Sequence, residues 1–158
     1  MFLLIVIVLM LALPLISIVT QIVLRDHGAL HGALHGASHL AIVAKWYVFW
    51  AFGVRLSLAG LRQAIQPRYT AETILGFKGT EALFFVRELG FANVAMGSVG
   101  VASLFAPSWV TPAAMLGAIY YGLAGISHCF HKVRNKLENV ALVSDLFAAV
   151  VLATCCFA

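Results

Sequence analysis

Residues 2–24 read FLLIVIVLMLALPLISIVTQIVL, a run without a single charged side chain. A helix that crosses a bilayer needs about 20 consecutive apolar residues, and this run is long enough. Four further apolar segments follow, so the sequence predicts five transmembrane helices, at about residues 2–24, 41–61, 83–106, 111–130 and 137–158. We expect an all-α integral membrane helical bundle, a single transmembrane domain over residues 1–158 in which an N-terminal anchor helix accompanies a four-helix core.

The composition excludes a water-soluble globular protein. Of the 158 residues 63% are hydrophobic and 10% are charged, whereas soluble domains contain about 45–50% apolar and about 25% charged residues. No soluble segment is longer than a loop, which also excludes a large catalytic domain outside the membrane. The first segment lacks the positively charged start and the small-residue cleavage site of a signal peptide, so we expect it to be retained as an anchor.

The distribution of Lys and Arg predicts the orientation. Counting the residues that flank the segments, one side holds only Arg25 and Lys45, and the other holds Arg62, Arg68, Lys78, Arg87, Lys132, Arg134 and Lys136. Because basic residues accumulate in cytoplasmic loops, we expect a multi-pass protein of the inner (cytoplasmic) membrane with its N-terminus inside and its C-terminus outside. Trp46, Trp50 and Trp109 then fall at outer helix ends, as in an aromatic belt.

Ionisable side chains stand inside four of the five segments. A rise of 1.5 Å per residue places all of them in the cytoplasmic third of the bilayer, and they are Arg55, Glu88, His128 and Asp145. Asn93 and Ser144 extend this predicted cluster. Such residues mark ion, proton or ligand sites by default, although in-membrane hydrogen bonds also serve only to pair helices. A catalytic or metal site is the third interpretation, because Glu, His and Asp are competent ligands.

Three short stretches resemble a known family. They are residues 87–93 (RELGFAN), residues 121–128 (YGLAGISH) and the Ser144-Asp145 pair. The chain resembles, from roughly Trp46 to Ala158, an uncharacterised family of small bacterial polytopic membrane proteins that is catalogued as a domain of unknown function. The resemblance implies a helical bundle and draws attention to Glu88, His128 and Asp145, but it supplies no reaction.

A histidine repeat lies outside the stretch that carries this resemblance. Residues 27–39 read HGALHGALHGASH, which places His27, His31, His35 and His39 at successive i, i+4 positions. On a helix such neighbours share a face, and the pair can chelate a divalent metal such as zinc, copper or nickel. Three interleaved glycines weaken a water-exposed helix. The repeat is therefore either a metal site on the outer side, a tolerated linker, or a stretch that packs closely on another helix.

Short local signals in the sequence predict two helix starts and one short additional helix. Thr80 and Glu81 predict the start of the third helix, Asn135 and Glu138 have the spacing of a capping box, and a short interfacial helix is expected near residues 70–75. The sequence contains no phosphate loop, nucleophile elbow or haem-attachment motif. Its few basic residues lie close to span ends, so nucleic acid is not an expected partner.

These observations favour a transport-like or receptor-like membrane protein whose polar cluster binds a proton or a small polar ligand. The first alternative is a non-catalytic accessory subunit of a larger membrane complex, and the second is a membrane-embedded enzyme or metal-binding protein. The expected partners are the lipid bilayer and other membrane subunits or further copies of the chain. A cavity that reaches the cluster favours the ligand site or the enzyme, whereas a dry, fully paired network favours the subunit.

Overall fold

The computed structural model describes residues 2–26, 38–77, 79–130 and 136–158, and these residues form helices without any β-strand. Three segments are π-helical (η1, η2 and η3) and η4 is a 3₁₀-helix. In chain order the helices are α1 (Phe2–Ile7), η1 (Val8–Ala12), α2 (Leu13–Asp26), α3 (His39–Tyr47), η2 (Val48–Val54), α4 (Arg55–Ile65), η3 (Tyr69–Ile74), α5 (Glu81–Ala102), η4 (Pro107–Trp109), α6 (Val110–Phe130) and α7 (Lys136–Cys155).

Five stretches of the described residues are long and apolar enough to cross a membrane. They are Leu3–Asp26, His39–Ile65, Glu81–Ala102, Pro107–Phe130 and Lys136–Cys155. The predicted all-α bundle with five membrane-spanning helices is confirmed. The third helix ends at Ala102 rather than at residue 106, because the chain turns ahead of Pro107 and proline disfavours helical geometry in the residue before it.

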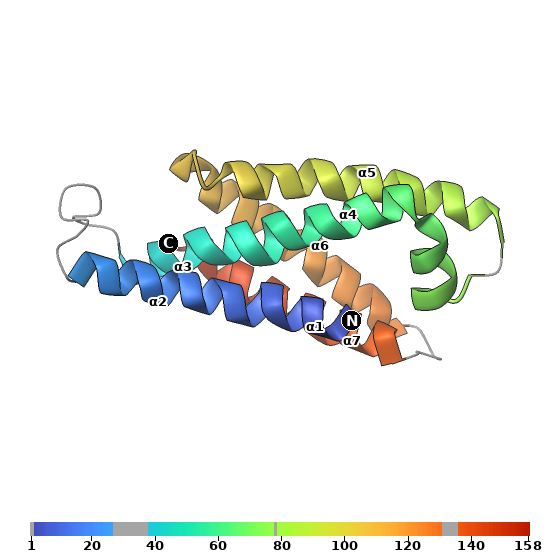
Figure 1. Ribbon diagram of the computed structural model, residues 1–158, viewed down its shortest axis with the longest axis horizontal. Helices are drawn as coiled ribbons and strands as arrows, with labels where there is room; N and C mark the ends of the chain where they lie inside the picture. Colours follow the sequence, from blue (N-terminus) through green and yellow to red (C-terminus); the bar gives the residue numbers. More distant parts are fainter. Residues whose placement is uncertain (1, 27–37, 78, 131–135) are drawn as a thin grey trace.

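All five spans run along the long axis of the molecule (Figure 1). The N-terminus lies at the same end as η3, and the C-terminus lies at the opposite end. The short helix η3, Tyr69–Ile74, folds back across that end of the bundle. It agrees with the short helix predicted near residues 70–75, and its interfacial location stays a prediction. Opposite ends for the two termini are what an odd number of spans requires.

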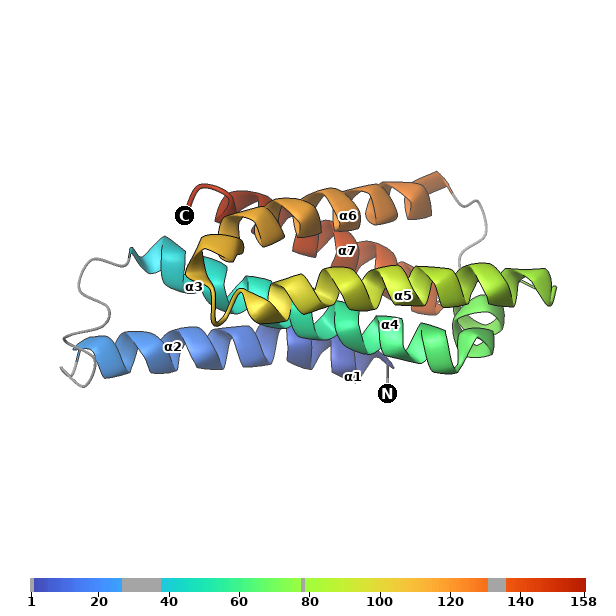
Figure 2. The same cartoon turned by 90° about the horizontal axis from the view of Figure 1, so that it is seen from above.

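The second span, α3–η2–α4, is the centre of the bundle. Its three parts contact α2, α5, α6 and α7, and Figure 2 shows it between the first span on one side and α6 and α7 on the other. The most extensive contacts are those of α4 with α5 and of α6 with α7. The bundle is therefore built from two antiparallel helix pairs, with the first span packed against the central helix.

Polar bonds attach the first span to the central one. The indole nitrogen of Trp46 donates a hydrogen bond of 2.6 Å to Gln21, and that of Trp50 donates one of 3.0 Å to Ser17. The span also buries Met10 in the core. The predicted N-terminal anchor thus packs as an integral part of the bundle, and Gln21 and Ser17 give it a defined register.

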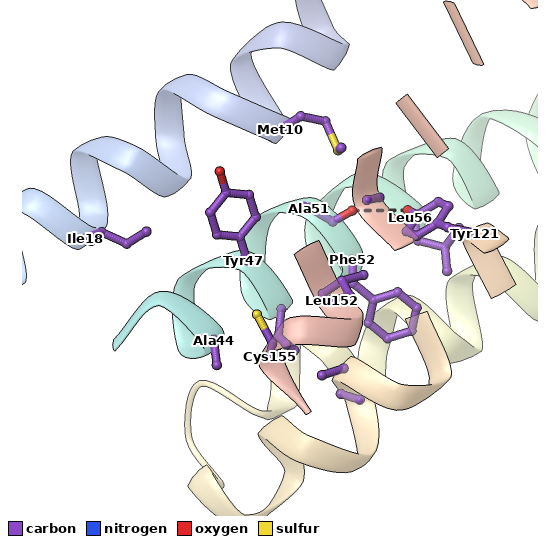
Figure 3. Close-up of a cluster of buried hydrophobic side chains, with 14 of the residues drawn as sticks. Met10, Ile18, Ala44, Tyr47, Ala51, Phe52, Leu56, Tyr121, Leu152 and Cys155 are labelled. Carbon is purple, nitrogen blue, oxygen red and sulfur yellow. Dashed lines mark hydrogen bonds between the residues drawn. The ribbon is translucent and has the colours of Figure 1, made fainter. Parts of the chain in front are cut away.

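The core is built from buried side chains of the first span, the central span, α6 and α7 (Figure 3). Phe52 is fully buried and meets the ring of Tyr121 edge-on, with ring centroids 6.3 Å apart. Leu152 and Cys155 of α7 and Met10 of the first span belong to the same core cluster. Outside this core, large apolar side chains are exposed on every span, as expected of a surface that faces lipid.

Glycines allow the central span and α5 to approach with their backbones in contact. A Cβ atom on Gly53 would lie 2.7 Å from the carbonyl carbon of Gly100, and one on Gly60 would lie 2.6 Å from the carbonyl oxygen of Gly90. Both distances are shorter than the closest approach of non-bonded heavy atoms, so neither position accepts a side chain without a shift of the backbone. In lipid the hydrophobic effect does not drive helix association, so such close van der Waals contact is the main stabilising force between these helices.

We therefore expect Gly100→Ala to destabilise the bundle by about 1–3 kcal/mol, the usual cost of overpacking, because the new Cβ would lie 2.6 Å from the Cα of Gly53. The measurement is thermal unfolding in detergent followed by circular dichroism. Gly122→Ala is the matched control, since its Cβ would meet only the Cβ of Ala149 at 3.8 Å. Equal melting temperatures for the two variants would contradict the close packing.

Candidate functional site

Arg55 owes its position to a wide helical turn. It is the first residue of α4 and follows the π-helical segment η2 directly. Its backbone N–H bonds to the carbonyls of Trp50 and Phe52 and bypasses that of Ala51, the acceptor of a regular α-helix. The Ala51 carbonyl instead accepts a hydrogen bond of 3.1 Å from the hydroxyl of Tyr121, drawn in Figure 3. The irregular turn thereby attaches α6 beside Arg55, in keeping with the frequent occurrence of π-bulges at functional sites.

The Arg55 guanidinium forms a buried ion pair with Asp145. Its Nη2 atom donates to Asp145 Oδ1 at 2.7 Å and to Ser144 Oγ at 2.9 Å. The two charged side chains are 12% and 10% exposed. The guanidinium carbon also lies 4.7 Å from the ring centroid of Tyr121, within cation–π range. The structure thus brings together Arg55, Asp145 and Ser144, as the sequence predicts.

Asn93 lies at the junction of three helices. Its side chain is 1% exposed, its Nδ2 donates to Gln63 Oε1 of α4 at 2.7 Å, and its Oδ1 accepts from the Tyr120 hydroxyl of α6 at 2.6 Å. Both ends of the amide are therefore satisfied. The predicted extension of the cluster through Asn93 is present, and it runs through Tyr120, the neighbour of Tyr121.

His128 pairs with Glu138, a carboxylate whose spacing in the sequence predicts a helix start. Its Nδ1 lies 3.3 Å from Glu138 Oε1, and Glu138 is buried at 4% exposure. The capping box with Asn135 cannot be followed, because that residue lies outside the described residues. The missed signal was helical spacing: Glu138 precedes Asp145 by two turns on α7, and Tyr121 precedes His128 by two turns on α6, so each pair shares a helix face.

A cavity of about 440 Å³ connects these groups. Its lining includes Arg55, Asn93, His128 and Asp145, four of the five residues predicted to bind a ligand or proton. Tyr69 and Thr70 of η3 line it too, so the cavity lies toward the end of the bundle that η3 covers. Its volume falls within the range of about 300–1,000 Å³ that small-molecule sites occupy.

Glu88 is not part of this cluster, so its predicted place beside Arg55 is corrected. Its side chain is exposed, and the carboxylate that Arg55 binds belongs to Asp145. The reason is the rotation of α5, whose buried face carries Gly90 and Asn93. At 100° per residue, Glu88 lies about 200° from Gly90 and so points away from the bundle.

The histidine repeat can be followed only at its last member. His27, His31 and His35 lie outside the described residues. His39 begins α3, is exposed, and accepts a hydrogen bond of 2.9 Å at its Nε2 atom from Arg25 Nη2. In the described ranges no three His, Cys, Asp or Glu side chains gather as a metal-ligand set. A metal site on the repeat stays a prediction.

Removing one partner of the Arg55–Asp145 pair leaves a buried charge uncompensated. We therefore expect Arg55→Met and Asp145→Leu each to lower the free energy of unfolding in detergent by about 3–5 kcal/mol, and the double variant Arg55→Met/Asp145→Leu to recover much of the loss. The measurement is a double-mutant cycle of melting temperatures. Glu88→Ala is the control and should change little, because its side chain is exposed. Strictly additive losses would show that the two residues do not interact.

Comparison with known proteins gives a family and no function. The chain matches the model of a family of unknown function, DUF6790, over residues 2–158. No curated protein and no solved structure matches it. The match is longer than the resemblance from Trp46 onward, because it includes the first span and the histidine repeat. The chain belongs to the family of unknown function DUF6790.

Proposed function

We propose that the protein is a membrane-embedded binding protein, of transport or receptor type, whose cavity takes up a proton or a small polar ligand. The observation that carries this proposal is the cavity of about 440 Å³ lined by Arg55, Asn93, His128 and Asp145. A network that only paired helices would be closely packed around these groups. The accessible space beside them supports a role in binding.

The chemistry of the lining supports reversible uptake. Asp145 supplies a carboxylate, His128 an imidazole and Arg55 a positively charged guanidinium, and the amide of Asn93 both donates and accepts hydrogen bonds. These side chains are held by hydrogen bonds and ion pairs between different helices. A proton or a polar ligand can exchange with such bonds without breaking the backbone contacts of α4 with α5.

An accessory-subunit role is the second candidate, and the exposed pair Arg87 and Glu88 on α5 supports it. Charged side chains on a membrane span are costly unless protein or water covers them. A second copy of the chain or another membrane subunit on this face would provide such cover. A membrane-embedded enzyme or metal-binding protein is the third alternative, and no contact among the described residues favours it.

The proposal includes a location and an orientation. The surplus of Lys and Arg around the η3 loop and the α6–α7 connection supports an inner membrane protein whose N-terminus and cavity lie on the cytoplasmic side. The surrounding lipid bilayer is then the first partner of the exposed apolar surface.

The orientation predicts opposite results for two C-terminal fusions. An alkaline phosphatase fused after Ala158 should be active, because it folds only outside, and a cytoplasm-dependent fluorescent protein at the same place should stay dark. The measurement is phosphatase activity and fluorescence of whole bacterial cells that express each fusion. Fusions placed after Gly76, in the η3 loop, serve as the reversed control. An inactive phosphatase and a fluorescent signal from the fluorescent protein after Ala158 would show the opposite topology.

The binding role predicts that polar reagents reach the cavity. In a variant whose Cys129, Cys155 and Cys156 are replaced by Ala, a cysteine at Ala141, which lines the cavity, should react readily with a small membrane-impermeant methanethiosulfonate. Ala148→Cys on the same helix is the matched control, because Ala148 is buried in the core and should react slowly. The reaction rate is measured by mass spectrometry of the protein in lipid nanodiscs. Equally slow reaction at both positions would show a closed, dry network and favour the subunit role.

A further inference from the structure

Two arginines of α4 carry unpaired N–H groups beside the same cavity. Arg55 Nη1 and Arg62 Nε are buried and have no hydrogen-bond partner within the part of the chain that the structure describes. Both side chains line the cavity, and their spacing of seven residues places them on one face of α4, two turns apart. Buried polar groups in proteins are nearly always bonded. Each of these donors is therefore available to an acceptor that enters the cavity.

The charges around the cavity are unequal. Asp145 is the one carboxylate among the lining residues, and it is bonded to Arg55 at 2.7 Å. Arg62 forms no ion pair within the described ranges, and its guanidinium carbon lies 3.8 Å from the ring centroid of Tyr69. That stacking holds the planar group in place and leaves its charge without a counter-ion. The missing acceptor is therefore expected to be an anion.

The rest of the lining is suited to hydrocarbon. Half of the lining side chains are apolar, among them Ile5, Leu58 and Leu89. These three are 39%, 49% and 38% exposed, so the cavity reaches the apolar outer surface of the bundle. A ligand can thus place a charged head at the arginines and an apolar body along the side that lipid covers.

We propose that the cavity binds an anionic amphiphile. Its carboxylate or phosphate head accepts hydrogen bonds from Arg62 Nε and from the free Nη1 of Arg55, and its hydrocarbon part lies along Ile5, Leu58 and Leu89. Guanidinium groups are the preferred partners of both kinds of head, because their planar array of donors matches the oxygen atoms. This inference rests on the proposed function, since it names the ligand class of the same cavity.

The test is equilibrium binding to the full-length protein in phosphatidylcholine nanodiscs. The probes are radiolabelled dodecanoate, dodecyl phosphate, dodecanol and inorganic phosphate. We expect saturable binding of dodecanoate or dodecyl phosphate, with none of dodecanol, which lacks the charge, and none of inorganic phosphate, which lacks the hydrocarbon. The last two probes separate an amphiphile site from simple lipid partitioning and from a site for a free anion.

Variants of Arg62 connect the binding to the cavity, because they leave the Arg55–Asp145 pair intact. Arg62→Gln should weaken binding of the anionic probe about ten- to a hundredfold, the range for one lost charged hydrogen bond. Arg62→Lys keeps the charge and should retain much of the affinity, which separates loss of charge from loss of folding. Arg68→Gln is the matched control, since Arg68 is exposed and does not line the cavity.

The outcomes separate this inference from the proposed function. Three results would contradict an amphiphile site in this cavity. They are no saturable binding of either anionic amphiphile, binding of inorganic phosphate alone, and equal affinity of Arg62→Gln and the unaltered protein for the anionic probe. If the Ala141→Cys variant still reacts with the polar reagent in that case, the cavity is accessible and the proposed function stands with another ligand. If that variant is also unreactive, both proposals fail.

Discussion

A guanidinium inside an apolar helical bundle must find a carboxylate, and this requirement organises the structure. Arg55 lies within the central span and its partner Asp145 lies within the last one. Their bond, together with the bond from Arg55 to Ser144, fixes how far α4 and α7 can slide or rotate relative to each other. Since a lone charge at this depth costs at least about 2.5–3.5 kcal/mol, other registers of the two helices are disfavoured.

The sequence predicted the depth of the polar residues better than their direction. Rise per residue places Arg55, Glu88, His128 and Asp145 at one level, but it does not say how each helix is rotated about its own axis. On α5 the rotation follows from Gly90 and Gly100, which contact the central span through their backbones. Such a stripe of small residues marks the packed face, and applying it as a test of direction would have placed Glu88 on the opposite face.

Two further features could not be predicted from apolar periodicity. The π-helical segment η2 changes which carbonyl each N–H meets, so the helix phase before Arg55 differs from the phase after it. The hydrophobic pattern of a span that is apolar on most sides does not reveal such a change in helix phase. Glu138 was assigned to a helix start because its spacing from Asn135 fits a capping box, whereas its pairing with His128 depends on tertiary contact between α6 and α7.

The position of the cavity follows from the way the two helix pairs are joined. Close backbone contact unites α4 with α5, and α6 packs extensively on α7, whereas α5 and α6 touch far less. Three polar interactions connect the two pairs. They join Arg55 to Asp145, Tyr120 to Asn93 and Tyr121 to the carbonyl of Ala51. Side chains that bridge two separate pairs leave space around themselves, because the backbones are held apart. The ligand that we propose for this cavity would contact the same guanidinium that joins α4 to α7, so its binding would be coupled to the spacing of the helix pairs through a shared residue.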